Sequence, residues 1–245
     1  MSGGVMVVTG GGRGIGAATA RLGAERGYAV AINYRGSKEQ AEALAAEIAN
    51  GGGRAIAVQG DVAKEADAVR LFEAVDRELG PVTALVNNAG ITGPTRRVAD
   101  LDYETLRSVL DINVIGSFLC AREAVRRMST ARGGRGGAIV NISSRASEIG
   151  GGGEFVIYGA SKGAIDTFTV GLAREVAAEG IRVNAVNPGL IETEIHPDGR
   201  LQRMVPMVPM GRAGTAEEVA EVILWLLSDA ASYVTGARVP IGGGR

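Results

Sequence analysis

Residues 5–16 read VMVVTGGGRGIG, a short apolar run followed by a turn crowded with glycine. The apolar run predicts a buried strand, and the residues from Gly14 onward predict the start of a helix. Glycines between the two allow backbone conformations closed to other residues and let a ligand approach closely. Because unpaired amides at a helix start attract anions, this strand–turn–helix unit predicts a site for a dinucleotide pyrophosphate.

The same alternation of apolar runs and helical patterns continues along the 245-residue chain. We therefore predict one doubly wound, Rossmann-type α/β domain over residues 1–245, with about seven parallel strands and helices on both faces. Predicted strands occupy 5–9, 29–33, 54–59, 84–87, 138–143, 182–187 and 238–241, and predicted helices occupy 14–26, 38–49, 65–79, 102–130, 157–179 and 215–228.

The longest irregular stretch, 188–214, follows a predicted strand. Loops of this length in a compact domain are usually functional or disordered, and ligands bind at the carboxyl ends of strands in open α/β sheets. We expect 188–214 to be a substrate lid rather than a disordered loop. It contains His196, the sole histidine. Because no cluster of cysteines or acids stands at ligand spacing, we expect no metal site.

The charge balance and cysteine content restrict the class of protein. The formal net charge is −1, so no electrostatic footprint for nucleic acid or an anionic membrane is present. No apolar run approaches the roughly 18–20 residues that span a bilayer. The start of the chain does not resemble a signal peptide. Cys120 is the only cysteine, which fits a reducing compartment, and we expect a cytoplasmic protein.

The end of the second predicted strand indicates which dinucleotide binds. NAD-specific sites usually place an acid there for the ribose 2′-hydroxyl, whereas an arginine suits a 2′-phosphate. The segment reads Ile32-Asn33-Tyr34-Arg35 and contains no acid. Arg35, helped by Arg13 in the glycine turn, favours NADP over NAD. The alternative is that both arginines are simply solvated.

Tyr158 and Lys162 stand four residues apart in a predicted helix, so their side chains project from the same face. Reduction of a ketone requires a proton donor for the developing alkoxide, and free tyrosine has a pKa near ~10. An ammonium about 4 Å away, at an effective dielectric of about 20, contributes roughly 4 kcal/mol, or about 3 pKa units. We therefore expect Lys162 to bring the pKa of Tyr158 toward neutrality.

Five motifs in this order resemble those of the short-chain dehydrogenase/reductase family, over essentially the whole chain. They are Thr9-Gly10-x-x-x-Gly14-Ile15-Gly16, Asn87-Asn88-Ala89-Gly90, Ser144, Tyr158-x-x-x-Lys162 and Asn187-Pro188-Gly189. Within the family the chain is most similar to the 3-oxoacyl-carrier-protein reductase and glucose 1-dehydrogenase type. The resemblance implies hydride transfer between a nicotinamide cofactor and a carbonyl or secondary alcohol.

The resemblance also implies roles for individual residues. Ser144 steadies the substrate oxygen, with Ser143 as the competing candidate, and Asn113 holds a water that relays protons to Lys162. Tyr158 and Lys162 also contact the cofactor. The remaining cofactor-binding residues implied are Gly10, Arg13, Gly14, Ile15, Gly16, Arg35, Asp61, Val62, Asn88, Gly90, Pro188, Gly189, Ile191 and Thr193.

Several expectations concern partners and alternatives. The family implies a homotetramer, for which the helices at 102–130 and 157–179 offer apolar faces. Arg96, Arg97 and Arg145 are expected at the substrate rim, where they either receive an acidic group or are solvated. Acyl-carrier reduction and oxidation of a sugar or small alcohol both stay open. A catalytically silent dinucleotide-binding regulator or scaffold is the alternative of a different class.

Overall fold

One parallel sheet forms the centre of the computed structural model, which describes residues 3–194 and 199–245. Within these residues it has seven strands in the order β3-β2-β1-β4-β5-β6-β7. The order reverses between β1 and β4, which is where open α/β sheets bind their ligands. The strands are β1 (Val5–Val8), β2 (Ala29–Tyr34), β3 (Ala55–Gln59), β4 (Val82–Asn87), β5 (Gly137–Ile142), β6 (Ile181–Pro188) and β7 (Arg238–Ile241).

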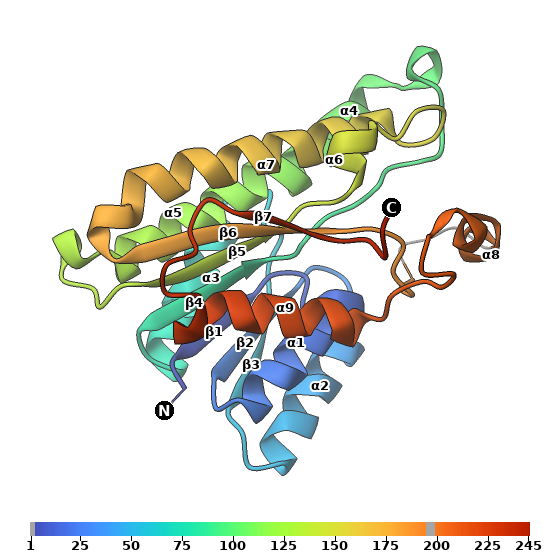
Figure 1. The fold of residues 1–245 in the computed structure, drawn as a ribbon. Coiled ribbons are helices and arrows are strands. Elements are labelled where there is room, and N and C mark those ends of the chain that lie inside the picture. Colours follow the sequence, from blue (N-terminus) through green and yellow to red (C-terminus); the bar gives the residue numbers. More distant parts are fainter. Residues whose placement is uncertain (1–2, 195–198) are drawn as a thin grey trace.

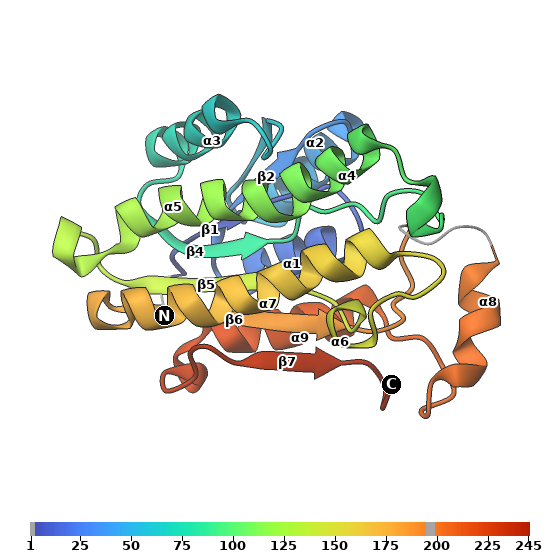
Figure 2. The same ribbon diagram turned by 90° about the horizontal axis from the view of Figure 1, so that it is seen from above.

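Helices cover both faces of the sheet (Figure 1, and from above in Figure 2). One face carries α3 (Glu65–Glu78), α4 (Tyr103–Leu110), α5 (Gly116–Met128) and α7 (Val156–Val176), and the other carries α1 (Gly14–Glu25), α2 (Lys38–Asn50) and α9 (Ala216–Leu227). The side chains of β1 alternate between two hydrophobic cores, one on each face of the sheet. Val5 and Val7 belong to the core that α3, α5 and α7 cover, and Met6 and Val8 belong to the core that α1, α2 and α9 cover. Burial on both faces explains why these strands are apolar without alternation.

The predicted helix at 102–130 is not continuous. A π-helical segment, Asp111–Ile115, separates α4 from α5, and the Gly116 amide donates to the Asp111 carbonyl five residues back. The expectation of one regular helix was therefore wrong. The wider turn buries Asn113, whose side chain pairs with the backbone of Ile91 on the neighbouring loop. Such π-bulges are frequent at functional sites.

Two short helices escaped the sequence pattern. They are α6 (Ala146–Ile149) and α8 (Arg200–Met204), which are too brief to show a helical period. Both lie at the carboxyl end of the sheet (Figure 1). Cys120 is fully buried in α5, whereas Trp225 on α9 is 42% exposed. No helix among the described residues combines the length and apolarity that a membrane crossing requires.

Candidate active site

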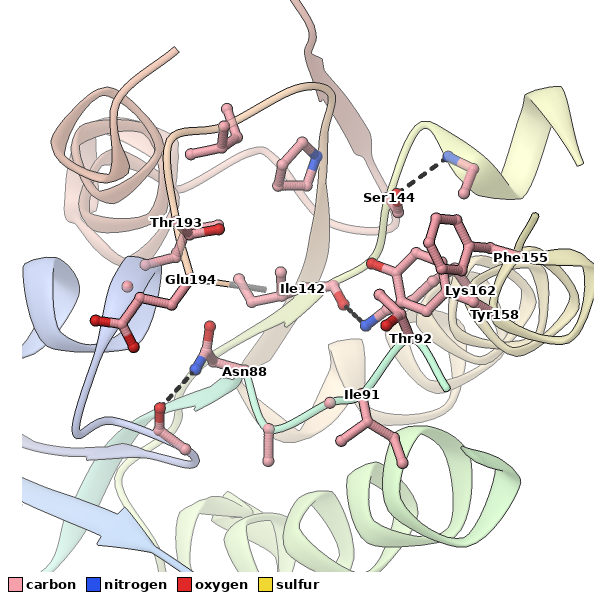
Figure 3. Close-up of a pocket in the computed structure, with 18 of the residues that line it drawn as sticks. Asn88, Ile91, Thr92, Ile142, Ser144, Phe155, Tyr158, Lys162, Thr193 and Glu194 are labelled. Carbon is pink, nitrogen blue, oxygen red and sulfur yellow. Dashed lines mark hydrogen bonds between the residues drawn. The ribbon is translucent and has the colours of Figure 1, made fainter. Parts of the chain in front are cut away.

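A cleft of about 1140 Å³ opens at the carboxyl ends of the strands (Figure 3). It is larger than most small-ligand pockets, which measure roughly 300–1,000 Å³. Gly16 and Asn113 are not among its lining residues. The other predicted residues line it together: Gly10, Arg13, Gly14, Ile15, Arg35, Asp61, Val62, Asn88, Gly90, Ser144, Tyr158, Lys162, Pro188, Gly189, Ile191 and Thr193.

The glycine turn after β1 has the shape of an anion cradle. Gly10 and Gly14 have φ angles of +60° and +53°, which favour glycine. A Cβ on Gly16 would lie 2.5 Å from Asn88 Nδ2, so Gly16 lets α1 start close against β4. The Arg13 side chain makes no capping hydrogen bond to α1 within the described residues. The first amides of α1 therefore stay available to an anion in the cleft.

Asn88 holds this turn in place. Its Nδ2 donates to the carbonyls of Thr9 and Gly10 at 2.9 and 3.0 Å, and Thr9 Oγ1 accepts from the amides of Asn88 and Ala89 at 3.0 Å each. The Asn88 side-chain amide therefore ties the glycine turn to the end of β4.

The outer end of the cleft carries the two predicted arginines. Arg35 directly follows β2 and is exposed, and Arg13 lies 3.4 Å from Glu194 in a largely exposed ion pair. Asp61 turns its carboxylate back to the Ala63 amide at 3.1 Å. Asn33 was missed as a site residue, although a polar residue ending an apolar strand was the available signal. It lines the cleft and binds Gly60 O at 3.0 Å.

Ser144, Tyr158 and Lys162 meet at the inner end of the cleft (Figure 3). Lys162 is 4% exposed, and its Nζ donates to the Ile142 carbonyl at 2.6 Å. The same Nζ lies 5.6 Å from the centroid of the Tyr158 ring. Ser144 interacts with the Tyr158 phenol, whereas Ser143 Oγ donates to the Lys162 carbonyl at 3.1 Å. Of the two serines, Ser144 is therefore the one beside the phenol.

Burial dominates the proton affinities here. It raises the pKa of the Tyr158 phenol, and the Ser144 hydroxyl and the charge of Arg200 only partly oppose it. The expectation that Lys162 brings this pKa toward neutrality does not describe the structure, because desolvation outweighs the neighbouring donors and charges. Burial also lowers the pKa of Lys162 to about 8, against the carboxylate of Asp166, which raises it. Lys162 is thus an ammonium at neutral pH and loses its proton above about pH 8.

Asn113 acts on this cluster from behind. Its Oδ1 accepts from the Ile91 amide at 2.8 Å, and its Nδ2 donates to Ile91 O and Ser161 Oγ at 2.9 Å each. A Cβ on Gly90 would lie 3.2 Å from Asn113 Oδ1 and 3.5 Å from Lys162 Nζ. Asn113 therefore fixes the 90–92 loop against α7, close to the Lys162 ammonium.

A family model described as Enoyl-(Acyl carrier protein) reductase matches residues 10–245. The chain is 52% identical to the uncharacterized oxidoreductase YgfF of Escherichia coli (98% of this chain, 99% of that protein). It is 42% identical to cis-4-hydroxycyclohexanecarboxylate dehydrogenase of Sinomonas cyclohexanicum (98% and 95%) and 39% identical to 3-oxoacyl-[acyl-carrier-protein] reductase of Synechocystis (98% and 96%).

Solved structures agree with these relatives. The 3-ketoacyl-(acyl-carrier-protein) reductase of Brucella melitensis, complexed with NADH, superposes with a TM-score of 0.93 at 33% identity (100% and 98% covered). A blue fluorescent protein from a metagenomic library, in complex with NADPH, gives 0.92 at 36% identity (99% and 98%). The chain belongs to the short-chain dehydrogenase/reductase family. As a member, it is an NAD(P)-dependent oxidoreductase.

The substrate end of this short-chain dehydrogenase/reductase contains residues that the sequence did not single out. Arg200 on α8 lies 3.2 Å from Glu154 and 5.0 Å from the Phe155 ring centroid, so α8 is tied to the loop before α7. All three residues line the cleft, near Tyr158. No sequence pattern predicts these contacts, because they join segments about 46 residues apart.

The rim arginines behave differently from one another. Arg145 lines the cleft, as expected, and donates to Arg245 O at 2.8 Å and Glu148 Oε2 at 2.6 Å. Arg96 pairs with Asp102 at 3.6 Å, and neither Arg96 nor Arg97 is among the residues lining the cleft. The Arg96 amide nevertheless donates to Glu154 O at 3.3 Å, so Arg96 lies beside a residue that lines the cleft. Residues 3–194 and 199–245 contain no acid, cysteine or histidine cluster placed to hold a metal ion, and His196 lies outside them.

Proposed function

We propose that this protein transfers hydride between NADP(H) and a carbonyl or secondary alcohol, with Tyr158 as its acid/base. The observation that carries the proposal is the arrangement of one cleft. Its outer part is formed by the glycine turn and Arg35, and its inner part by Ser144, Tyr158 and the buried Lys162. A dinucleotide fits this cleft because the turn is made of glycines. A side chain at these positions would strain the backbone or clash with neighbouring atoms, so the turn stays open for the pyrophosphate.

The residues that would hold the cofactor divide by position. The turn from Gly10 to Gly16 would receive the pyrophosphate, Arg35 and Arg13 the 2′-phosphate, and Asp61 with Val62 the adenine. Asn88 and Gly90 shape the wall beside them. At the other end, Lys162 would bind the nicotinamide ribose, and Pro188, Gly189, Ile191 and Thr193 the carboxamide. The bound cofactor supplies or takes up the hydride.

The chain's own residues perform the proton chemistry. In the reductive direction Ser144 donates a hydrogen bond to the substrate oxygen, and Tyr158 gives its proton to the oxygen as charge develops. The raised pKa of Tyr158 keeps this donor protonated at neutral pH. Lys162 stabilises the phenolate that remains. Asn113 supports the relay of a proton back to Tyr158 by fixing the 90–92 loop beside Lys162.

The substrate side of the cleft is mostly apolar. Ile149, Phe155, Met204 and Met207 line it, and Arg145 and the Arg200–Glu154 pair are among its charged residues. This favours a ketone or alcohol with a sizeable apolar body. A cyclic hydroxy acid and an acyl thioester, named for two relatives, are both candidates. We further propose that segment 188–214 is the lid over this substrate, anchored by the Ile191–Gly214 bridge.

The proposal is tested by following the absorbance of NADPH with a panel of ketones, cyclic keto acids and acyl thioesters. Turnover of at least one compound, abolished by the Tyr158 variant described in the Discussion, supports the enzyme. Binding of NADPH with no turnover of any compound would instead support the alternative, a silent dinucleotide-binding regulator. The complete Ser144, Tyr158 and Lys162 set favours the enzyme.

Replacing Arg35 with alanine is expected to lower the affinity for NADPH relative to NADH by about tenfold or more, because the exposed 2′-phosphate loses a charge-assisted partner. Titration of each reduced cofactor, followed by its fluorescence, measures the ratio. Arg54→Ala is the control, since Arg54 is also exposed and belongs to the segment before β3. An unchanged NADPH-to-NADH ratio in Arg35→Ala would contradict the NADP assignment.

We also propose a homo-oligomer, a tetramer by family resemblance. Tyr103, Leu110, Ile115 and Phe118 are large apolar residues exposed between 38% and 65% along α4, the π segment and α5. Contiguous exposed apolar surface commonly marks a protein–protein contact. Light scattering coupled to size exclusion is expected to give four times the 25.1 kDa chain mass. Phe118→Glu is expected to reduce that mass, and a monomeric wild type would contradict the proposal.

A cytoplasmic location completes the proposal. The single cysteine, Cys120, is fully buried in α5, and burial raises the pKa of its thiol to about 12. Such a thiol is unreactive, and a chain with a single cysteine cannot form an internal disulfide, which fits a reducing compartment.

A further inference from the structure

A buried carboxylate lies behind the proposed catalytic pair. Asp166 is 4% exposed in α7, one helical turn after Lys162, and is not among the residues lining the cleft. Both of its oxygens lie 3.1 Å from Asn187 Nδ2. Besides Lys162, its charged neighbour is Arg238 of β7, whose Nη1 is 4.0 Å from Asp166 Oδ2. Burying an acid is costly unless it is paired, so this position calls for an explanation.

Asn187 connects this acid to the rest of the site. It is the last residue but one of β6 and immediately precedes Pro188-Gly189, and its Nδ2 also lies 3.2 Å from Ser147 Oγ and 3.4 Å from Ser144 O. Its Oδ1 is buried and accepts no hydrogen bond from the described residues. The amide is therefore held by its donor side alone, and Asp166 is its charged acceptor. One junction thus joins α7, the end of β6 and the loop that carries Ser144.

The charges around Lys162 are few. On α7 it faces Tyr158 and Asp166. Its Nζ donates to the Ile142 carbonyl of β5. Its neighbours in the π segment and the 90–92 loop are Asn113 and Gly90, both of which are neutral. Arg200 of α8 acts on Tyr158, and Arg238 of β7 acts on Asp166. Among residues 3–194 and 199–245, Asp166 is therefore the carboxylate whose charge opposes the effect of burial on the Lys162 ammonium.

We propose that Asp166 is a positioning residue: it keeps Lys162 protonated during turnover and, through Asn187, holds the Ser144 loop and the Pro188-Gly189 turn against α7. The inference rests on the proposed function, in which Lys162 acts as an ammonium. Burial lowers the pKa of Lys162 to about 8, and the Asp166 carboxylate raises it. Without that carboxylate the ammonium would lose its proton at lower pH.

Asp166→Asn tests the charge, because an amide of the same shape still accepts from Asn187. The alkaline limb of the kcat/KM profile for ketone reduction is expected to move to lower pH by about half a unit or more. The rate at pH 8 should fall about twofold or more, and the rate at pH 6 should stay close to that of wild type. Asp166→Glu, which keeps the charge, is expected to return the limb toward its wild-type position.

Thr169→Val is the matched control. Thr169 is fully buried in α7 and accepts from Asn141 Nδ2 at 2.9 Å, so its loss weakens packing without changing charge. It is expected to lower the melting temperature and leave the alkaline limb in place. An unmoved limb in Asp166→Asn, or an equal shift in Thr169→Val, would overturn the inference.

A second readout separates this inference from the proposed function. Acetylation of Lys162 by acetic anhydride, followed against pH by mass spectrometry, reports its proton affinity without any turnover. Lys38 and Lys64, the other lysines of the chain, serve as internal references. The labelling midpoint of Lys162 is expected to fall in Asp166→Asn while theirs stay fixed, and an unchanged midpoint would overturn the inference. A wild type that reduces no carbonyl compound would instead count against the proposed function.

Discussion

Tyr158→Phe is expected to lower kcat for ketone reduction by about 10²–10⁴-fold, the range typical for loss of a general acid. Phenylalanine keeps the aromatic ring beside Lys162 and Ser144 and removes the phenol hydroxyl, which is the proton donor of this side chain. The affinity for NADPH should stay within a few-fold, since the glycine turn and Arg35 lie at the other end of the cleft. Steady-state rates and a cofactor titration measure the two effects separately.

Tyr233→Phe provides the control for the loss of a phenol hydroxyl, because Tyr233 is fully exposed and is not among the cleft residues. It should match wild type in both measurements. If Tyr158→Phe retained a rate within tenfold of wild type, another group would have to supply the proton, and the proposed acid/base would be wrong.

Lys162→Met is expected to lower kcat by about 10²-fold or more and to weaken cofactor binding. The ammonium lies 5.6 Å from the centroid of the phenol ring. At that separation and an effective dielectric of about 20, a unit charge contributes roughly 3 kcal/mol to the phenolate, or about two orders of magnitude. Methionine fills similar space without the charge. Lys64→Met, at an exposed lysine, should change neither quantity.

The pH dependence of the wild type should carry the signature of the same residue. A group whose pKa is lowered to about 8 is charged below that pH and neutral above it. Reductive kcat/KM is therefore expected to be steady at neutral pH and to fall as the pH rises through about 8. In Lys162→Met this limb should be absent, and the residual rate should persist until Tyr158 itself titrates. A limb at the same pH in both proteins would assign it to another group.

The sequence predicted the sheet well because burial on both faces leaves an unmistakable mark. All seven predicted strands are present, with ends shifted by no more than two residues, and their parallel order follows from the helices between them. The π segment and helices α6 and α8 were not predicted. Each is shorter than the window in which a helical period can be recognised, and each depends on contacts with distant segments.

The sequence predicted which residues line the cleft better than it predicted what those residues do there. Motif spacing selected residues that do gather in one cleft, Ser144, Tyr158 and Lys162 among them. The role of Asn88 in locking the glycine turn depends on contacts about 79 residues apart, which spacing does not reveal. The direction of the Tyr158 pKa was also beyond the sequence, because it is set by desolvation, and the degree of burial appears only once the chain is folded.

The π segment has a consequence for how this chain tolerates changes in length. A π-turn takes up one residue more than an α-turn, so the residues after it stand one position, about 100° on a helical wheel, from where the sequence of an unbroken helix would place them. The face of α5 that buries Cys120 and Ala124 meets the sheet because this turn absorbs the extra residue. Deleting one residue between Asp111 and Ile115 would give an ordinary α-helical turn and leave that face inward, while the buried position of Asn113 would be lost. The extra residue therefore serves the catalytic cleft and not the packing of α5.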